Sequence, residues 1–260
     1  MKIHRILALA LPLALMVLTA VAGQAKEDGT LSLSPAVVML RGDHGQSTRQ
    51  TFTLTNGTSR PFSFDLVASD VIVLDGKRVM VDAGSMAGSI AGTAVFSQNH
   101  VDVPPGQSAA VSVTLTLAPG AEHRAVVVTF RGTNKVMSGN VPMTASLGSL
   151  MTFALTDKRE LSASDLAVRP QSATENLAVA QTCRNSGSEP FVAKGVMAVV
   201  DAQGALVGRE SFEPRRLLPG EQMELGGEYP GELASGRYRV VVTYDYEGGT
   251  ITKSAEVVIP

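Results

Sequence analysis

The sequence is poor in the residues that carry most catalytic and metal chemistry. Its 260 residues include one cysteine, four histidines and no tryptophan. A single cysteine excludes both an internal disulfide and a cysteine-based zinc site. Charged residues make up only 18% of the chain, which excludes a charge-rich disordered protein. A formal net charge of −2 also lacks the basic excess that is typical of nucleic-acid-binding domains.

Long apolar runs are also absent, except at the N-terminus. Two basic residues precede an apolar stretch over residues 6–22, and small residues follow it. This order is typical of a secretory signal peptide cleaved after Ala22 or Ala25, with an uncleaved membrane anchor as the alternative. Pro12 and the small residues favour cleavage. We therefore predict a signal peptide at residues 1–25 and a periplasmic or secreted mature chain without a transmembrane segment.

Beyond residue 30 the sequence alternates short β-forming segments with turns. The turns contain Asn-Gly, Asp-Gly and Pro-Gly pairs, which favour the backbone angles of tight turns. Alternation of period two is clearest in residues 238–246. No long helical stripe is present, so the sequence predicts an all-β sandwich or barrel. The strands expected in the first half are residues 31–40, 48–55, 61–68, 109–117, 125–131 and 143–155.

Two blocks of sequence recur in the same order. Residues 53–62, which read Thr-Leu-Thr-Asn and then Pro-Phe, recur at 182–191 with an offset of 129. A Pro-Gly pair followed by a Val- and Thr-rich run recurs from 105–130 to 219–244, with an offset of 114. The first copy therefore holds about fifteen additional residues. We place them in the Gly-, Ala- and Ser-rich segment 82–93.

The repeat predicts two tandem β-sandwich domains, at residues 26–157 and 163–260. The polar segment between them contains Lys158 and Arg159, which we expect on a solvated face. The repeat also places Cys183 at the position of Leu54. Because a free cysteine is commonly a small buried residue, we expect Cys183 to face the core.

No catalytic constellation stands out. The nearest match to a nucleophile elbow, residues 106–110, lacks the final glycine and leads from a turn into a strand rather than into a helix. Methionines between positions 137 and 151 would suit copper(I), but their place in a strand pattern favours core packing. We therefore predict no enzyme activity, no cofactor and no metal site. Three histidines are expected in separate loops: His44, His100 and His123.

The strand expected at residues 145–155 is apolar on both faces. Such a strand at the end of a domain could pair with a strand added by a partner protein. In the alternative, one face fills the core and the other packs on the neighbouring domain. The partner-binding residues of the first hypothesis are Leu147, Leu150, Met151, Phe153 and Leu155.

The order of these motifs resembles the first domain of periplasmic pilus chaperones. The shared motifs are Ser-Pro at 34–35, the segment 53–62, Val-Pro-Pro-Gly-Gln at 103–107 and the long last strand. The resemblance implies an immunoglobulin-like fold and a pilus-type subunit held by strand addition along that last strand. Pilus chaperones carry a basic residue in the first strand and another in the last, where they anchor the subunit's terminal carboxylate. Here residues 34–40 and 145–155 contain neither lysine nor arginine.

The whole chain also resembles the two-domain surface proteins that partner WxL-domain proteins in Gram-positive bacteria. The second domain shares Leu-Pro-Gly at 218–220 and Gly-Arg-Tyr at 236–238. That family ends in a membrane helix with a basic tail, which residues 257–260 do not resemble. We expect a non-catalytic, chaperone-like module that binds a protein in the cell envelope and does not bind nucleic acid. The alternative is an envelope adaptor that binds wall polymer or a surface protein through loops, above all residues 82–93.

Overall fold

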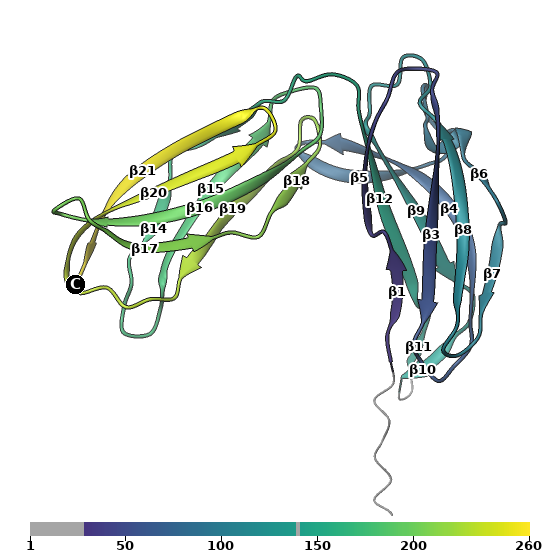
Figure 1. The fold of residues 1–260 in the computed structure, drawn as a ribbon, viewed down its shortest axis with the longest axis horizontal. Helices are drawn as coiled ribbons and strands as arrows, with labels where there is room; N and C mark the ends of the chain where they lie inside the picture. Colours follow the sequence, from purple (N-terminus) through teal and green to yellow (C-terminus); the bar gives the residue numbers. More distant parts are fainter. Residues whose placement is uncertain (1–28, 139–140) are drawn as a thin grey trace, which may run out of the picture.

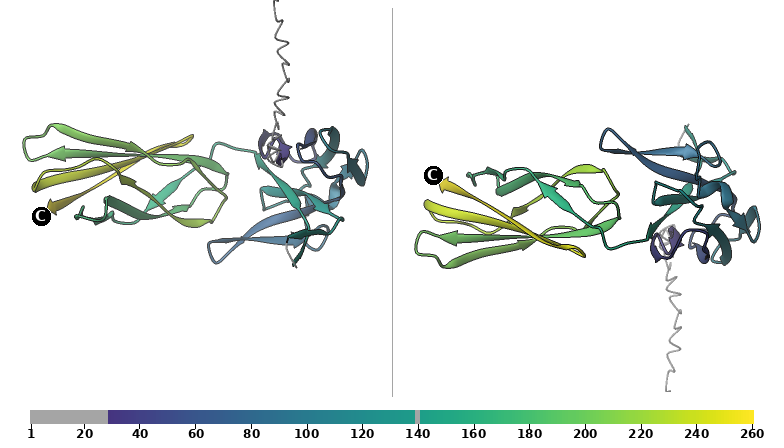
Figure 2. Two further views of the ribbon diagram at one scale, coloured as in Figure 1. Left: turned by 90° about the horizontal axis from the view of Figure 1, so that it is seen from below. Right: turned by 90° about the horizontal axis from the view of Figure 1, so that it is seen from above.

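The computed structural model describes residues 29–138 and 141–260, so the expected signal peptide lies outside the described residues. The chain forms two β-sandwiches that meet near one end of each, which gives the molecule a bent outline (Figure 1). Figure 2 shows the same two bodies from below and above. Within the described ranges, no helix has the length and apolar character needed to cross a bilayer. Regular helix there is limited to the single turn η1 (Ala91–Thr93).

The first sandwich is built from two main sheets. One has the order β1-β3-β8-β6, and the other has the order β2-β12-β9-β4-β5 with β7 also paired to β4. A small hairpin, β10-β11, leads into β12. The strands are β1 (Leu31–Ser34), β2 (Val37–Arg41), β3 (Ser47–Asn56), β4 (Phe62–Leu74), β5 (Lys77–Asp82), β6 (Val95–Phe96), β7 (His100–Val103), β8 (Ser108–Thr116), β9 (Ala125–Gly132), β10 (Val136–Ser138), β11 (Val141–Met143) and β12 (Ser146–Ala154).

The second sandwich also has two sheets. In one, β15 pairs with β13 and β14 along one edge and with β19 along the other; the second has the order β17-β16-β20-β21, with β18 also paired to β16. The strands are β13 (Leu161–Ala163), β14 (Ala167–Arg169), β15 (Leu177–Asn185), β16 (Phe191–Asp201), β17 (Leu206–Ser211), β18 (Arg215–Leu217), β19 (Gln222–Tyr229), β20 (Gly236–Tyr246) and β21 (Gly249–Ile259). The all-β tandem-sandwich fold expected from the sequence is confirmed.

Strand register confirms the internal repeat residue by residue. In the first copy β4 pairs antiparallel with β9, and in the second β16 pairs antiparallel with β20. Applying the two sequence offsets to one register reproduces the other. The opposed pairs are Leu66–Phe130, Ala68–Val128 and Asp70–Val126 in the first copy, and Gly195–Tyr244, Met197–Val242 and Val199–Val240 in the second.

A buried asparagine joins the same elements in each copy. Asn56 and Asn185 are both fully buried, and each donates from Nδ2 to the carbonyl four residues later and to a second carbonyl across the sandwich. The glycine of the matching Pro-Gly turn donates its N–H to the asparagine carbonyl in both copies, at 2.7 Å from Gly106 and 2.9 Å from Gly220. The repeated motif is therefore a structural lock between a strand end and a turn.

Each sandwich has its own apolar core. Fully buried aromatic rings anchor both, with Phe52 and Phe130 in edge-to-face contact in the first core and Tyr244 in the second. Cys183 is fully buried in the second core, as its alignment with Leu54 predicts. Burial raises the pKa of its thiol to about 11, which disfavours the reactive thiolate.

Candidate functional site

The strand expected to bind a partner is open along only half of its length. β12 pairs antiparallel with β9 from Ser146 to Thr152, and parallel with β2 from Leu150 to Ala154. Along Ser146–Ser149, no strand of residues 29–138 or 141–260 covers the other side. The outer edge of β12 thus divides into a half covered by β2 and an open half, which we call the open edge.

The five residues predicted to bind a partner fall into three environments. Met151 and Phe153 fill the first core, and Leu147 is half-buried against that core. Leu150 is half-buried on the opposite face, in a cluster that includes Leu218 of the second sandwich. The fifth residue, Leu155, follows the strand end and donates its N–H to Oε2 of a buried glutamate, Glu189, at 3.0 Å.

Hydrogen bonds fix which backbone groups face the open edge. The N–H of Leu150 donates to the carbonyl of Ala36, and the carbonyl of Ala154 accepts from Gly42, so even-numbered residues of β12 face β2. Because backbone direction alternates along a strand, the N–H and C=O groups of Ser146 and Gly148 also point outward. These groups form a short row ready to pair with an added strand.

The open edge exists because the first strand changes sheets. β1 pairs with β3 in one sheet, and after Pro35 the chain continues as β2 along β12 in the other. The sandwich therefore has a seam between β1 and the open edge. Half-buried apolar side chains that pack on the core line this seam: Leu31, Leu33, Ala145 and Leu147.

A basic cleft between the sandwiches adjoins the covered half of β12. It is lined by Val37 and Leu150 from the first sandwich and by Arg215 and Arg216 from the second, among others. Arg216 Nη1 donates to Oγ1 of Thr152 at 2.9 Å. The second sandwich therefore places a guanidinium against the last strand, whose own residues 145–155 contain neither lysine nor arginine.

Arg216 is an unusually placed cation. Burial lowers the pKa of its guanidinium, and the positive charge of the nearby Arg78 adds to the effect. In the described part of the chain no carboxylate lies within ion-pair distance of Arg216, whereas Arg78 binds Glu221 at 2.7 Å. Arg215 likewise pairs with Glu213 at 2.7 Å, so an anion entering the cleft would find Arg78 and Arg215 already neutralised and Arg216 available.

The two sandwiches touch through a small, mixed interface. Val71, Ala125 and Leu218 are buried together, and the β4-β5 hairpin reaches across to the second sandwich. At its tip the carbonyl of Gly76 accepts from the N–H of Gln222 at 2.9 Å. These contacts hold the walls of the basic cleft together.

A buried polar cluster around Asp70 was not predicted from the sequence. Asp70 is fully buried, and its carboxylate accepts hydrogen bonds from Ser89 Oγ, from the N–H groups of Ile90 and Ala91, and from His123 Nε2 at 2.8 Å. His123 lies in the loop before β9, as expected, but its side chain is buried and bonded to Asp70. The overlooked clue was a charge on the core-facing parity of β4, where Phe62, Phe64 and Leu66 are also buried.

The geometry of this cluster is that of an anchor for the additional segment 82–93. Burial raises the pKa of the Asp70 carboxyl, but the bonds from His123, Ala91 and Ser89 outweigh burial and hold it below its usual range. Ser89 and His123 both bond to Asp70 rather than to each other, so no hydroxyl is activated as in a catalytic triad. Across the described ranges no group of three His, Cys, Asp or Glu side chains is arranged to hold a metal.

In the linker between the sandwiches Lys158 is exposed, as expected, but Arg159 is buried. The Arg159 side chain is 1% exposed, and its Nη1 and Nε lie 3.1 Å and 3.2 Å from carboxylates of Asp157 and Glu247. The expectation that Arg159 is solvated is therefore wrong. The carboxylate that neutralises this arginine comes from the turn between β20 and β21, which lies nearly 90 positions away in sequence.

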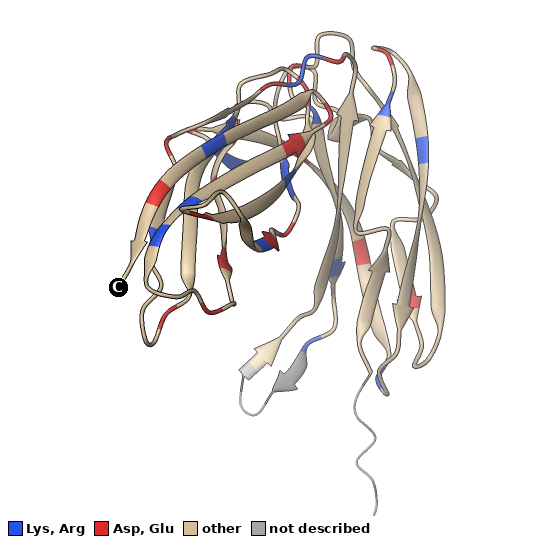
Figure 3. Cartoon of the chain, turned by 60° about the vertical axis from the view of Figure 1, so that its left-hand side comes forward, with Lys and Arg blue, Asp and Glu red and all other residues tan. Residues whose placement is uncertain are grey.

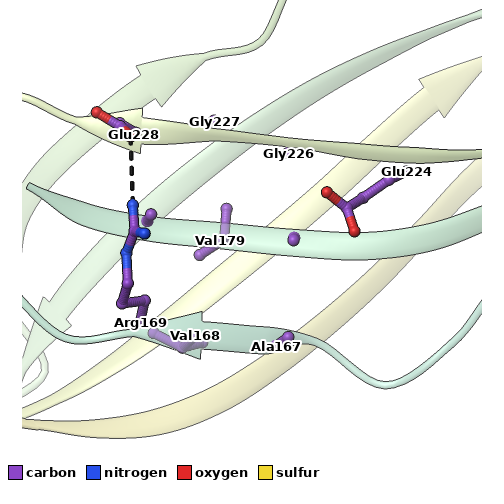
Figure 4. A pocket seen from close by; sticks show the side chains of 10 residues that line it. Ala167, Val168, Arg169, Val179, Glu224, Gly226, Gly227 and Glu228 are labelled. Atoms are coloured by element: carbon purple, nitrogen blue, oxygen red, sulfur yellow. Dashed lines mark hydrogen bonds and ion pairs between the residues drawn. The ribbon is translucent and has the colours of Figure 1, made fainter.

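The remaining surface offers less chemistry. Figure 3 shows basic and acidic residues interspersed over both sandwiches. A shallow depression on the β14-β15-β19 sheet is lined mostly by alanine, glycine and valine (Figure 4). Its Arg169 is paired with Glu228 at 3.4 Å, so this cation is already satisfied.

Comparison with known proteins gives the following result. No family model and no curated protein sequence matches the chain. Among solved structures, the class 5 fimbriae chaperone CfaA is 13% identical, with a TM-score of 0.44 over 89% of this chain and 99% of that one. The Escherichia coli chaperone DraB is 15% identical, with a TM-score of 0.40 over 89% and 97%. The CsuC-CsuE chaperone–tip subunit complex of Acinetobacter baumannii is 11% identical, with a TM-score of 0.42 over 89% of this chain and 100% of that one. The chain is thus similar to fimbrial chaperones over most of its length.

Proposed function

We propose that this protein is an exported, non-catalytic binding protein that holds an extended segment of a partner by strand addition at the open edge. The observation that carries the proposal is the row of outward backbone groups on Ser146 and Gly148, in a strand whose inner side is fully paired. Unpaired strand edges are reactive toward other strands, so an edge left open in a stable sandwich is a natural binding surface.

The side chains beside the open edge favour an apolar partner strand. An added strand would direct every second side chain into the seam between β1 and β12, toward Leu33 and Leu147. Those side chains would complete a core that is only half covered at this position. The partner segment is therefore expected to alternate apolar and polar residues, which makes the role chaperone-like, since such segments aggregate when exposed.

The basic cleft would bind the end of the same segment. The available guanidinium of Arg216 lies over Thr152, beyond the point at which β2 takes over the edge. A carboxylate there would form a charge-assisted pair with a half-buried cation. We propose that a terminal carboxylate or acidic side chain of the partner binds Arg216, while the strand pairs with the open edge.

A proline substitution tests the strand addition. The N–H of Gly148 points outward, so Gly148→Pro removes a donor for the partner and no bond within the sheet. Fluorescence anisotropy would measure binding of a labelled twelve-residue peptide of alternating valine and threonine. We expect affinity to fall at least about tenfold, because one bond is lost and the ring blocks the edge. Val258→Pro, on the exposed outer edge of β21, is the matched control.

The cleft is tested separately with the same peptide. Amidation of its C-terminus and the substitution Arg216→Gln should each weaken binding about five- to tenfold, and together no more than either alone, because both remove one pair. Peptide binding that is unchanged in Gly148→Pro would overturn strand addition, and would favour recognition through loops such as residues 82–93.

A further inference from the structure

We propose that Glu221 limits the basic cleft to one carboxylate of the partner, because it neutralises Arg78 and leaves Arg216 as the cation that binds. This inference rests on the proposed function, since it concerns the end of the segment that the cleft would hold. Its consequence is a requirement on the partner. The last residue of the bound segment should add no second carboxylate to the terminal one.

Glu221 is a buried carboxylate surrounded by N–H groups. Its side chain is 6% exposed, and Oε1 lies 2.7 Å from Nε of Arg78. Oε2 accepts from Arg78 Nη2 at 2.9 Å and from the N–H of Leu218 at 2.8 Å. The two contacts with Arg78 form a forked ion pair, and the bond from Leu218 holds the carboxylate in place. The charge of Arg78 is therefore compensated inside the protein.

The repeat shows that the turn itself does not require an acid at this position. Glu221 corresponds to Gln107, which follows the matching Pro-Gly pair of the first sandwich. In both copies the N–H of this residue donates to the carbonyl three residues earlier, at 3.0 Å from Glu221 and 3.1 Å from Gln107. Gln107 is exposed, whereas Glu221 is buried against Arg78. The backbone therefore accepts either side chain, and the carboxylate serves the contact with the arginine.

The two arginines are neighbours with different partners. Arg78 Nη2 donates to the carbonyl of Arg216 at 2.6 Å, and Arg216 Nη1 donates to the hydroxyl of Thr152 at 2.9 Å. Burial lowers the pKa of the Arg216 guanidinium and the charge of Arg78 lowers it further, while Glu247, which lies outside ion-pair distance, opposes both. A hydroxyl carries no net charge, so Arg216 keeps its charge for an anion and Arg78 does not.

The other basic side chains of the cleft are exposed to solvent. Lys77 and Arg215 both line it, and Arg215 is already paired with Glu213. Water and salt screen exposed charges, so these two side chains contribute little to the binding of an anion. A second carboxylate would meet Arg78 together with Glu221, whose negative charge repels it. The cleft is therefore complementary to one carboxylate.

Two labelled twelve-residue peptides of alternating valine and threonine test this selectivity. One ends in asparagine and the other in aspartate, both with a free C-terminus, so they differ by one negative charge and hardly in shape. In fluorescence anisotropy the wild type should bind the two equally, within about twofold. Glu221→Gln frees Arg78, so this variant should bind the aspartate peptide about three- to fivefold more tightly than the asparagine peptide.

Two further variants assign this preference to Arg78. Arg78→Gln combined with Glu221→Gln should restore equal affinity for the two peptides, because the freed cation is gone. Glu213→Gln is the matched control, since it frees the exposed Arg215 by the same substitution. Its affinities for the two peptides should stay within about twofold of each other, because water screens that charge.

Three results would overturn the inference. The first needs no variant: a wild-type protein that binds the aspartate peptide at least threefold more tightly than the asparagine peptide. The second is a preference for the aspartate peptide that persists in the double variant. The third is a preference in Glu213→Gln as large as that in Glu221→Gln.

The selectivity of the cleft is also measured without strand addition. The NMR signal of the Arg216 Nε–H is titrated with acetate, which has one carboxylate, and with malonate, which has two. The wild type should bind both equally, and Glu221→Gln should prefer malonate. This result in a protein that binds neither peptide would contradict the proposed strand addition and support the selectivity of the cleft. An Arg216 signal that neither anion shifts would overturn the inference.

Discussion

The two sandwiches fill one equivalent buried position with residues of opposite polarity. Asp70 in β4 and Val199 in β16 are equivalent by the repeat, and each is fully buried opposite an equivalent valine of the neighbouring strand. The first copy has an additional segment whose Ser89, Ile90 and Ala91 supply hydrogen-bond donors to the carboxylate. The second copy lacks that segment and fills the position with a side chain that needs no donors. A buried charge is thus tolerated where a loop satisfies it.

The edges of the two copies differ as well. In the second sandwich β20 and β21 are each 11 residues long and pair along their whole length. In the first sandwich the corresponding end is occupied by a strand that changes sheets, which leaves Ser146–Ser149 open. Within the described residues β21 ends its sheet, so its outer edge is free as well. The copies differ because β2 covers half of the last strand of the first sandwich and apolar side chains line the seam beside the other half, and we assign binding to that half.

Exchanging the residues at the repeated position should have the largest effect on stability. Asp70→Val leaves three donors and the His123 Nε2–H without an acceptor, and should destabilise the first sandwich by about 4 kcal/mol. Val199→Asp should destabilise the second by at least as much. All four tyrosines lie between positions 229 and 246, so tyrosine fluorescence in urea reports the second sandwich and circular dichroism reports both.

The substitution Asp70→Val should also change how the stability of the first sandwich depends on pH under acidic conditions. The pKa of Asp70 is lowered in the folded state, so its contribution is fully present above the unfolded value of about 3.9 and is lost as the pH falls through the folded value. The wild-type first sandwich should lose stability below about pH 4, and Asp70→Val should lose less over that interval. Equal acid sensitivity in both proteins would contradict this role for the carboxylate.

The asparagine locks should behave alike in the two copies. Asn56→Ala and Asn185→Ala each remove the two bonds that Nδ2 donates to backbone carbonyls and the bond that Oδ1 accepts from the N–H two residues later, at a cost of about 3 kcal/mol. Only Asn185→Ala should move the tyrosine fluorescence transition. If either substitution lowered the free energy of unfolding by less than about 1 kcal/mol, the two asparagines would share a geometry but contribute unequally to stability. Thr53→Ala, on an exposed position of β3, is the control.

A smaller effect is expected where the second copy has lost a side chain. Gly195 occupies the position of Leu66, and a Cβ there would meet the rings of Phe212 and Tyr244. Gly195→Ala should therefore cost about 2 kcal/mol through overpacking. Combining it with Phe212→Leu should recover part of that cost, because the shorter side chain makes room. Costs that simply add would contradict direct contact between position 195 and the Phe212 ring.

Local features of the sequence predicted local structure well. The turn residues marked the strand ends, and the repeat correctly placed Cys183 in the core, because burial at this position depends on strand parity. The asparagine lock was visible as a repeated Asn, although its bonds to the Pro-Gly turn were not. These features rest on residues close in sequence or on spacing that both copies share.

The features missed by the sequence analysis all depend on non-local pairing. Nothing in residues 145–155 shows that β2 covers one half of the strand, since this depends on where the first strand changes sheets. The Asp70 cluster brings together Asp70 of β4, Ser89 of the additional segment and His123, which are far apart in the chain. Arg159 is buried because Glu247 neutralises it from a distant turn.

The smallest predicted effect is a pH dependence confined to the surface of the first sandwich. His100, expected in a loop, lies in β7 between the carboxylates of Asp65 and Asp102, with Nδ1 2.7 Å from Asp65. The hydrogen bond to Asp65, followed by that to Asp102, raises the pKa of His100. The repeat places Lys194 at the position of Asp65, so the second sandwich has no such pair.

Because the folded pKa of His100 is raised, its contribution is present below the unfolded value of about 6.5 and is lost as the pH rises through the folded value. The side chains are exposed, so the change in melting temperature should be small. An NMR titration of the His100 ring gives a sharper measurement. Asp65→Asn should lower the His100 pKa more than Asp102→Asn does, since the Asp65 bond is the shorter. The opposite order would show that Asp102 has the larger effect on the His100 pKa. The exchange of Asp65 for Lys194 would then not be the difference between the two sandwiches that matters for this histidine.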